Sequence, residues 1–395
     1  MAGSLGLRQR GWFGDKMKES NKKIRLLICD VRPLLDVGEV HRAYLKKSIS
    51  LDPEKFDIQI LDVSSNRNTV IANLLALTRV PQCIKQMKNS DVVLLQSPFT
   101  PATIVLGACA MTKRVPFIVV PRGDFPPPFR LFRMVRKPIL KWTIWLMFVR
   151  LLLSRAYMIV VTSEKEGKRL QLASGGLKNL CVIPNPSISR VKGEEQLPRN
   201  GQSLWEEHRP FALFLGRISW EKGLDILLNC WPAVIMRSPG ALLILAGPVA
   251  HPEVLSRLMR IRKRLKLEES ILFMGWVEGK LKRQLMARAR CLVLPSHFES
   301  FGNVVLEALA VGTPVVASTG TPWKDLDGIA GRWIPREEGA WAEAIAEYLR
   351  PGRKAALDEE TKSRLLEPFR SERVTEMWGE LIESSARREP VPRDR

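Results

Sequence analysis

Two glutamates eight positions apart are the residues of this chain best placed to act on a ligand. Glu299 and Glu307 stand in HFESFGNVVLEALAVGTPVVAS, residues 297–318, on either side of a Gly-Asn turn. A run of small and branched apolar residues follows them. Carboxylates this close to a buried segment are usually hydrogen-bonded locally or used on a ligand. The pair is therefore a candidate site for a ligand that offers hydrogen-bond donors.

The turn between the two glutamates is predicted to begin a helix. It follows the strand-like run CLVLPS, residues 291–296, and the helix should begin near Gly302 or Asn303. Its free N–H groups and positive dipole end favour a phosphate group or a polar sugar. Glu307 then lies about one turn into the helix, roughly 6 Å further along. Carboxylates on both sides of an anion site suit a nucleotide sugar, which has hydroxyl groups on both sides of its diphosphate.

A second polar group follows the first apolar run of the C-terminal half. In GRISWEKG, Arg217 ends the run and Lys222 comes five positions later, with Gly216 and Gly223 at either end. Glycines allow the backbone to approach a ligand closely. Arginine can hold a diphosphate through paired hydrogen bonds, and lysine acts as a point charge. The segment is a candidate diphosphate site, although such cations are often only solvated loop residues.

Apolar runs of strand length alternate with helical patterns along most of the chain, which predicts parallel sheets covered by helices on both faces. The chain has 395 residues, and one polar stretch interrupts the alternation of strand and helix patterns. Because this length exceeds that of a usual single domain, two domains are expected. Ligands of such α/β units bind at the carboxyl ends of the strands, and the cleft between two units is the natural site. The strand-like runs are 23–30, 56–63, 91–97, 116–120 and 157–163, then 211–217, 241–247, 270–275, 291–296 and 313–318.

The interruptions in this pattern give the expected domain limits. A polar, Gly/Pro-rich stretch stands between the two series of strands and has the composition of a linker. The expected division is a disordered basic extension (1–21), an N-terminal domain (22–186), a linker (187–209), a C-terminal domain (210–367), a closing helix that packs back on the N-terminal domain (368–384) and a disordered tail (385–395).

Four segments in this order and spacing resemble the C-terminal domain of glycosyltransferase family 4. They are GRISWEKGLDIL, LLILAGP, ILFMGWV and PSHFESFGNVVLEALAVGTPVVAS, and Glu299 with Glu307 resembles that family's E-x7-E motif. The resemblance continues through PRGDF, TSEKE, CVIPNP, TPWKDL and FRSERVTEMWGELIE, so it spans roughly residues 22–384. It implies the GT-B fold, two Rossmann-like domains with a donor and acceptor cleft between them. It also implies a retaining, metal-independent hexosyltransferase with no cofactor besides its UDP-sugar or GDP-sugar donor.

Carried over position by position, the resemblance implies a role for each polar residue. Arg217 and Lys222 would bind the diphosphate and stabilise it as it leaves, and Glu299 would hold hydroxyl groups of the donor sugar. Glu307 would accept a hydrogen bond from the ribose. Further donor-site residues would be Gly216, Val277 in the loop for the base, and Phe301, Gly302 and Asn303, which would offer backbone N–H groups.

The N-terminal half departs from the family pattern at two positions. Where the family often has a Gly-Gly loop after its first strand, this chain has only Gly38, in DVGEV. Where many members have a histidine near the acceptor, it has Arg122-Gly123-Asp124. Asp124 is then a candidate for orienting the acceptor hydroxyl, and the alternative is that the leaving phosphate itself takes the proton.

The net charge of +21 indicates a polyanionic partner, either nucleic acid or an anionic membrane surface. Residues 129–155 favour a membrane, because they carry seven Arg or Lys, no acid, and interleaved bulky apolar residues that include Trp142 and Trp145. Charges at Lys141 and Arg150 interrupt the apolar run, so a transmembrane helix is not expected. The alternative is a core helix with a basic solvent face. No nucleic-acid-binding motif accompanies the charge.

These features place the protein on the cytoplasmic face of a membrane. The six cysteines are scattered and no secretory signal is present, which indicates a cytoplasmic protein held peripherally at the inner face of the plasma membrane. A cationic, apolar N-terminal domain suits a glycan or polyprenyl-linked acceptor. The family branch with PRG and TPW is common in bacterial surface-polysaccharide assembly, so lipopolysaccharide, O-antigen or exopolysaccharide synthesis is the expected setting.

Three other functions were weighed against the same residues. A glycosidase also uses two carboxylates but has no use for a diphosphate site beside them. Asp325 and Asp327 form a DxD pattern like that of metal-dependent transferases, but they do not follow a strand and are expected in a solvated turn; no histidines are spaced as metal ligands. The remaining alternative is a non-catalytic membrane- or polyanion-binding adaptor on a decayed GT-B scaffold.

Overall fold

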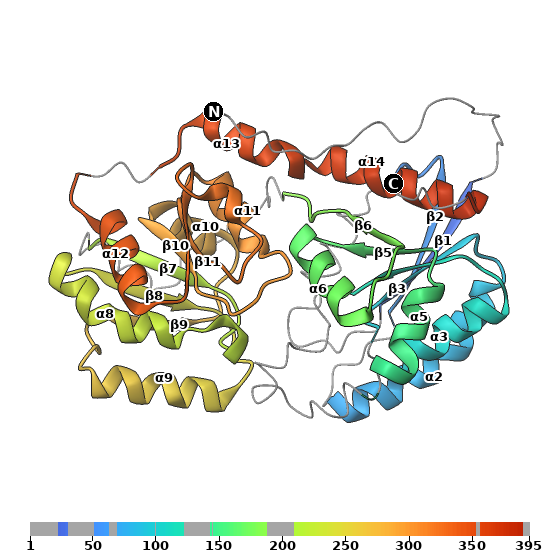
Figure 1. The fold of residues 1–395 in the computed structure, drawn as a ribbon, viewed down its shortest axis with the longest axis horizontal. Coiled ribbons are helices and arrows are strands. Elements are labelled where there is room, and N and C mark those ends of the chain that lie inside the picture. Colours follow the sequence, from blue (N-terminus) through green and yellow to red (C-terminus); the bar gives the residue numbers. More distant parts are fainter. Residues whose placement is uncertain are drawn as a thin grey trace.

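The structure is a computed structural model that describes residues 23–30, 51–62, 69–98, 100–121, 143, 145–187, 209–352 and 356–389. These residues form two six-stranded sheets, each flanked by helices (Figure 1). Every strand pair is parallel. The prediction of two successive open α/β units is therefore confirmed.

The first sheet has the strand order β2-β1-β3-β4-β5-β6. Strands β3, β4 and β5 are buried at every residue, which explains their unbroken apolar sequences. The strands are β1 Ile24–Asp30, β2 Phe56–Asp62, β3 Val92–Gln96, β4 Phe117–Val120, β5 Met158–Val161 and β6 Leu180–Val182. The helices are α2 Thr69–Met87, α3 Pro101–Thr112, the π-helical turn η2 Trp145–Val149, α5 Arg150–Arg155 and α6 Glu164–Ser174.

Alternate residues of the first sheet face two different cores. Leu27, Val93 and Val119 pack with residues of α2, α3 and α5. Their neighbours Leu26 and Leu94 point to the other face and pack against the C-terminal helix α14, Ser371–Arg387. This is the period-two alternation of a β-strand, with both faces covered.

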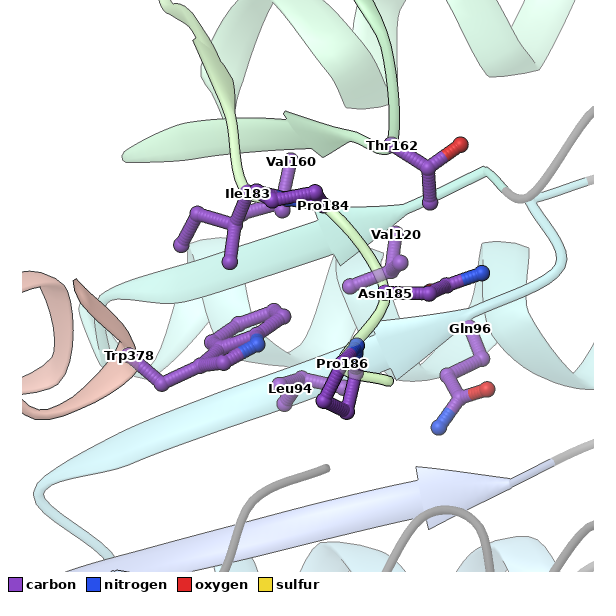
Figure 2. A pocket seen from close by; sticks show the side chains of 10 residues that line it. All are labelled: Leu94, Gln96, Val120, Val160, Thr162, Ile183, Pro184, Asn185, Pro186 and Trp378. Atoms are coloured by element: carbon purple, nitrogen blue, oxygen red, sulfur yellow. The ribbon is translucent and has the colours of Figure 1, made fainter. Parts of the chain in front are cut away.

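Helix α14 crosses from the C-terminal half of the chain to the first sheet, as Figure 1 shows. Its Val374, Trp378 and Ile382 are buried in the core of that sheet. Trp378 also forms one wall of a pocket at the carboxyl ends of β3, β4 and β5 (Figure 2). The helix ends at Arg387, so the expected start of a disordered tail at residue 385 is wrong by at least three residues.

The second sheet has the strand order β12-β11-β10-β7-β8-β9. Helices α8, α9 and α12 cover one face, and α10, α11 and α13 cover the other. The strands are β7 Phe211–Leu215, β8 Leu242–Ala246, β9 Ile271–Gly275, β10 Cys291–Leu294, β11 Val315–Ser318 and β12 Gly331–Ile334. The helices are η4 Trp220–Lys222, α8 Asp225–Arg237, α9 Pro252–Arg264, α10 Gly279–Arg288, α11 Asn303–Ala310, η5 Lys324–Leu326, α12 Glu338–Leu349, α13 Glu359–Leu366 and η6 Glu367–Phe369.

Strand β12 was not predicted from the sequence. It lies at the edge of the second sheet and exposes Arg332, so it lacks the apolar run that marks a buried strand. Most of residues 129–155 lies outside the described residues, as do the extension 1–21 and nearly all of the linker. The part that is described, from Trp145 onward, is helical. No helix within the described ranges is long and apolar enough to cross a bilayer.

Candidate functional site

The candidate site lies where the second sheet changes direction. Strands β8 and β9 continue from one side of β7, whereas β10, β11 and β12 lie on the other side. Ligands of open α/β sheets bind at the carboxyl ends of the strands at such a point. The loop after β7 carries Arg217 and Lys222, and the loop after β10 carries Glu299. Because β7 pairs with β10, the sheet brings these two loops together.

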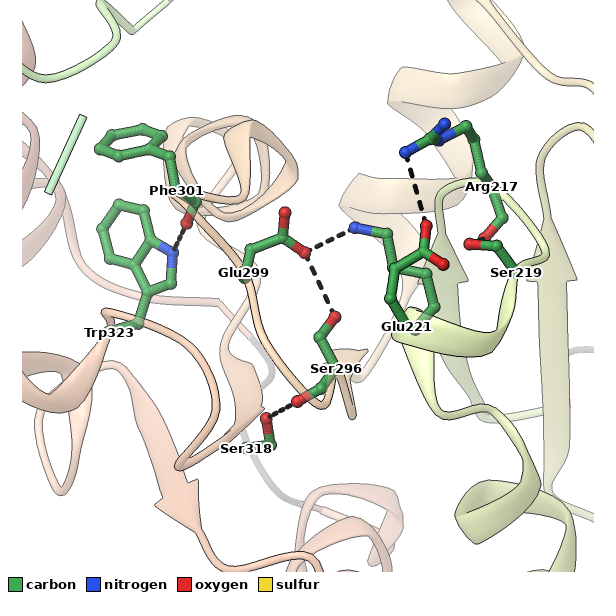
Figure 3. A network of polar contacts seen from close by, with 9 residues as sticks. Arg217, Ser219, Glu221, Ser296, Glu299, Phe301, Ser318 and Trp323 are labelled. Atoms are coloured by element: carbon green, nitrogen blue, oxygen red, sulfur yellow. Dashed lines mark hydrogen bonds and ion pairs between the residues drawn. The ribbon is translucent and has the colours of Figure 1, made fainter. Parts of the chain in front are cut away.

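The centre of the site is an ion pair between Lys222 and Glu299. Lys222 Nζ lies 2.5 Å from Glu299 Oε2, and the two side chains are only 15% and 16% exposed. The hydroxyl of Ser296 donates to the same carboxylate oxygen at 3.2 Å, and Figure 3 shows Glu299 directed toward it. The sequence assigned the lysine to a diphosphate and the glutamate to a sugar. The structure places the two groups in direct contact, so both would face one donor molecule.

Arg217 stands beside this pair with a carboxylate partner of its own. Its guanidinium lies 3.4 Å from Glu221 Oε1, and its side chain is 51% exposed (Figure 3). Glu221 was not singled out in the sequence. Its carbonyl also accepts from the backbone N–H of His297, which ties the loop after β7 to the loop after β10. Arg217 thus has an oriented side chain that is still open to a ligand.

The turn η4 that presents Lys222 ends at a glycine for a steric reason. Gly223 has a φ of 60°, in the left-handed region, and a Cβ there would lie 2.0 Å from a guanidinium nitrogen of Arg336. That guanidinium donates to the carbonyls of Pro295 and Gly223 at 2.8 and 3.4 Å. Burial lowers the pKa of Arg336. Arg336 therefore links the loop after β7 to the end of β10.

The predicted helix start is confirmed at Asn303, where α11 begins. Gly302 is its N-cap residue with φ 88° and ψ 68°, and no side chain caps the helix. The first N–H groups therefore remain available for a ligand. The expectation for Phe301 concerned its backbone N–H; its side chain is buried against Trp323 and Phe369. Its carbonyl accepts from Trp323 Nε1 at 2.5 Å, which fixes the turn (Figure 3).

Glu307 lies on α11 and is paired with a lysine of the neighbouring helix. Lys282 Nζ of α10 is 2.6 Å from Glu307 Oε2, and both side chains are about one-third exposed. The sequence gave no reason to single out Lys282, which looks like one of many surface lysines. In the structure it pairs with Oε2 of Glu307.

Two further predicted donor residues are held mainly by protein contacts. The side chain of Val277 is buried in the core between α10 and α11, so this residue would meet a base through its backbone. Gly216 donates its N–H to the carbonyl of Ala246 at 3.0 Å. A Cβ on Gly247, which follows β8, would lie 2.0 Å from the carbonyl oxygen of Gly216. Gly247 is thus needed for the close packing of these two loops. Gly38 and Asp124 lie outside the described residues.

Two of the residues that could have been metal ligands, Asp327 and His297, contact other groups of the protein. Asp327 accepts from the backbone N–H of Trp333 at 3.0 Å, while Asp325 is exposed in η5. The side chain of His297 stacks near Trp220, with ring centroids 6.5 Å apart, and burial lowers its pKa. The described ranges contain no cluster of three His, Cys, Asp or Glu that would hold a metal ion.

The N-terminal domain contacts the same loops through residues that the sequence left without a role. Ser163 and Lys165, in TSEKE, donate to carbonyls of the loops after β10 and β11. Asn185, in CVIPNP, donates to the side chain of Asn303 at 2.7 Å. Asn185 also lines the pocket of Figure 2, together with Gln96 and Thr162. That pocket has a volume of only about 10 Å³, room for one water molecule at most, so it is too small to hold a sugar.

The C-terminal half is similar to known transferase domains. A family model described as Glycosyl transferases group 1 matches residues 209–350. A D-inositol 3-phosphate glycosyltransferase of Actinosynnema mirum is 30% identical over 217 residues, which are 52% of this chain and 52% of that protein. A glycogen synthase of Mycobacterium tuberculosis is 28% identical over 243 residues, 60% of this chain and 56% of that protein. The chain thus spans about half the length of these curated relatives.

Solved structures resemble the whole chain more distantly. HepE of Anabaena, in complex with UDP and glucose, has a TM-score of 0.67 and 19% identity, with 91% of this chain and 100% of that chain covered. The lipopolysaccharide outer core galactosyltransferase WaaB has a TM-score of 0.60 and 15% identity, with 91% and 99% covered. At this identity the likeness shows the fold. The predicted two-domain, GT-B type α/β fold is confirmed.

Proposed function

Because residues 209–350 form a glycosyltransferase group 1 domain, we propose that the protein transfers a hexosyl group from a nucleotide-diphosphate sugar to a glycan or lipid-linked glycan, with retention of configuration and without a metal ion. The observation that carries this proposal is the contact between Lys222 and Glu299, beside Arg217 and the uncapped start of α11. A diphosphate needs the cations, a sugar needs the carboxylate, and the two groups are adjacent in one donor.

Donor binding would rearrange the central ion pair. The diphosphate would take Lys222 as its counterion and would accept from Arg217 and the first N–H groups of α11. Glu299 would then exchange the ammonium for hydroxyl groups of the sugar. At the other end of the donor, Glu307 would accept from the ribose while Lys282 holds its second oxygen. HepE was solved with UDP-glucose, which makes this compound the first donor to test.

Lys222 and Arg217 would also stabilise the transition state of the transfer. As the bond between the anomeric carbon and the diphosphate oxygen breaks, negative charge grows on the leaving group beside Lys222 and Arg217. Fixed charges stabilise such a transition state, and one well-placed donor is worth about 3 kcal/mol. The acceptor oxygen then bonds to the anomeric carbon on the face that the diphosphate leaves. Its proton passes to the departing phosphate oxygen or to Asp124.

The acceptor would bind against the N-terminal domain. Asn185, which follows β6, donates to the side chain of Asn303 at the start of α11, so this face of the N-terminal domain borders the proposed donor site. A short distance along the chain, η2 and α5 expose Met147, Phe148 and Leu151 beside Arg150 and Arg155. Exposed apolar residues among cations suit an anionic membrane surface. A polyprenyl-linked glycan at the inner face of the plasma membrane would meet both features.

The biological setting is proposed on the same grounds. A lipid-linked acceptor at a cytoplasmic membrane face fits the synthesis of lipopolysaccharide, O-antigen or exopolysaccharide. The fold shared with WaaB, a lipopolysaccharide galactosyltransferase, agrees with this setting.

Nucleotide release from a panel of UDP- and GDP-sugars, with a membrane extract as acceptor, tests the proposal. The wild-type protein should release the nucleotide of one donor, and Glu299→Ala should abolish that release. If no donor is turned over, or if Glu299→Ala leaves turnover unchanged, the transferase function is wrong. The adaptor function would then remain.

A further inference from the structure

Residues at the start of helix α6, in the N-terminal domain, bond to the loops that follow β10 and β11 in the C-terminal domain. Ser163 Oγ donates to the carbonyl of Ser300 at 2.6 Å. Thr162 Oγ1 lies 3.3 Å from the same oxygen but gives its proton to the closer Glu166 carboxylate. Lys165 Nζ donates to the carbonyls of Thr319 and, at 3.1 Å, Thr321. The bonds from Ser163 and Lys165 all end on backbone carbonyls of the C-terminal domain, so they act on the course of its loops.

The start of α6 is built to present these donors. Ser163 is the N-cap residue, and its hydroxyl accepts from the N–H of Glu166 at 3.2 Å while it donates to the other domain. Glu166 is buried, and its Oε2 accepts from the N–H and the hydroxyl of Thr162, both at 2.7 Å. This is a form of the capping box, which fixes a helix start on both sides. The donors therefore have little freedom to turn elsewhere.

Lys165 is a cation whose partners are neutral. Its ammonium is half-buried, bonded to two carbonyls and 5.5 Å from the centroid of the Trp333 ring. Burial lowers its pKa, as does Arg169 nearby. None of the described carboxylates forms an ion pair with it. A charge-assisted bond to carbonyls, out of bulk water, is stronger than a neutral one. Lys165 is therefore expected to stay bonded to the loop after β11, unlike a surface lysine whose ammonium is solvated.

The two loops that α6 holds are the ones that fix Glu299. The N–H of Glu299 donates to the carbonyl of Gly320 at 3.3 Å. The loops pack so closely that a Cβ on Gly320 would lie 2.4 Å from the carbonyl oxygens of Ser296 and His297. Glu299 is thus held on both sides. Its own N–H is bonded to the loop that Lys165 contacts, and the carbonyl of the next residue, Ser300, is bonded to Ser163.

We infer that Lys165 and Ser163 are positioning residues that set the carboxylate of Glu299 for the donor sugar, although they lie in the other domain. The inference rests on the proposed function. It implies that docking of the N-terminal domain strengthens binding of the sugar part of the donor. The nucleotide part, held by Arg217 and Glu307, is not affected.

Binding of UDP-glucose and of UDP, measured by calorimetry, tests this. If the panel of sugar nucleotides selects another donor, that donor and its free nucleotide replace them. Lys165→Met should weaken UDP-glucose binding about tenfold, the usual effect of losing a hydrogen bond to a charged group, and should leave UDP binding within about twofold of wild type. Lys165→Arg should restore most of the loss. Lys168→Met is the matched control, because Lys168 lies on the same helix and is 76% exposed; it should bind like wild type.

A double-mutant cycle separates positioning from general destabilisation. If Lys165 acts through Glu299, Lys165→Met should cost little further affinity for UDP-glucose in a Glu299→Gln background. Additive losses, or equal losses for UDP and UDP-glucose, would overturn the inference. If Lys165→Met does not fold, Ser163→Ala measured in the same way decides the question. Wild-type protein that binds no nucleotide sugar would overturn the proposed function as well, whereas normal donor binding by Lys165→Met would overturn this inference alone.

Discussion

The ammonium of Lys222 and the carboxylate of Glu299 lie 2.5 Å apart at the carboxyl ends of two neighbouring strands. Both side chains are mostly buried, so removing either one would leave the other as an unpaired charge with little water around it. A ligand that supplies a phosphate to one and hydroxyl groups to the other can replace this contact without leaving a bare charge. Under the proposed function, a nucleotide sugar would be such a ligand.

Removing the cation of this pair should affect the chemical step more than donor binding. In the proposed reaction Lys222→Met would remove a charge that faces the leaving diphosphate, so kcat should fall about a hundredfold or more, with a smaller change in KM. Steady-state kinetics of nucleotide release would measure both constants. Lys266→Met, at an exposed position of the same domain, is the control. A loss confined to KM would mean that Lys222 only binds the donor.

Under the proposed function, substitution of Glu307 should weaken nucleotide binding only when the nucleotide carries ribose hydroxyl groups. Glu307→Gln should weaken UDP binding by several-fold, since a charged acceptor of a hydrogen bond is lost. Binding of 2′,3′-dideoxy-UDP, which lacks the hydroxyl groups, should hardly change. Lys282→Met should show a milder form of the same pattern, and Lys280→Met, exposed on the same helix, should show none. Equal losses for both nucleotides would place Glu307 away from the ribose.

The sequence predicted the parts of the site that depend on local spacing. Lys222 belongs to a short glycine-bounded turn and Glu299 to the turn before a helix, and both motifs are visible in a single stretch of chain. The direct contact between them was not predicted. It depends on β10 lying next to β7, although Lys222 and Glu299 are 77 positions apart along the chain. Strand order is set by packing of the whole domain.

The residues that were missed have side chains of ordinary surface types. Lys165, Glu221 and Lys282 each lie in or beside a helix among other charged residues, where most side chains are only solvated. What distinguishes them is a partner from another element, which no local pattern records. The edge strand β12 was missed for a related reason, because its solvated side chains resemble those of a loop.

Gly302 should not tolerate a side chain. Its φ of 88° lies in the left-handed region, and a Cβ there would be 3.2 Å from Cγ of Glu299 and 3.3 Å from Nε1 of Trp323. Gly302→Ala should lower the free energy of unfolding by about 1 kcal/mol or more and should also reduce donor turnover, since Glu299 is displaced. Chemical denaturation and nucleotide release measure the two effects. Gly339→Ala, in helix α12 with open space around it, should be neutral or stabilising. Wild-type stability and activity in Gly302→Ala would contradict the strained geometry.

The partly buried imidazole of His297 predicts a loss of stability in acid. Burial, with Arg336 nearby, lowers the pKa of His297 below its ordinary value of 6.5. The unfolded chain therefore binds a proton at a higher pH than the folded chain, so this residue makes folding less favourable as pH falls below about 6.5. In His297→Gln the free energy of unfolding should fall less steeply between pH 7 and pH 5. Urea titrations at several pH values would show this, with His251→Gln as the control. Parallel curves for wild type and His297→Gln would refute it.

The exposed apolar residues of η2 and α5 predict attachment to anionic membranes. Met147, Phe148 and Leu151 are 61%, 47% and 51% exposed, whereas their neighbours Val149 and Leu152 are buried in the core. One side of η2 and α5 is therefore packed in the core. Their other side exposes apolar residues to solvent, with Arg150 and Arg155 also exposed. Wild-type protein should sediment with vesicles that contain phosphatidylglycerol and should stay in solution with vesicles of phosphatidylcholine alone, because both charge and apolar area are needed. Replacing the three residues by serine should release it. Leu172→Ser, at an exposed position of α6, is the control and should sediment like wild type. Unchanged sedimentation of the triple variant would remove this surface from the membrane contact and leave the cations of residues 129–155 as its remaining basis.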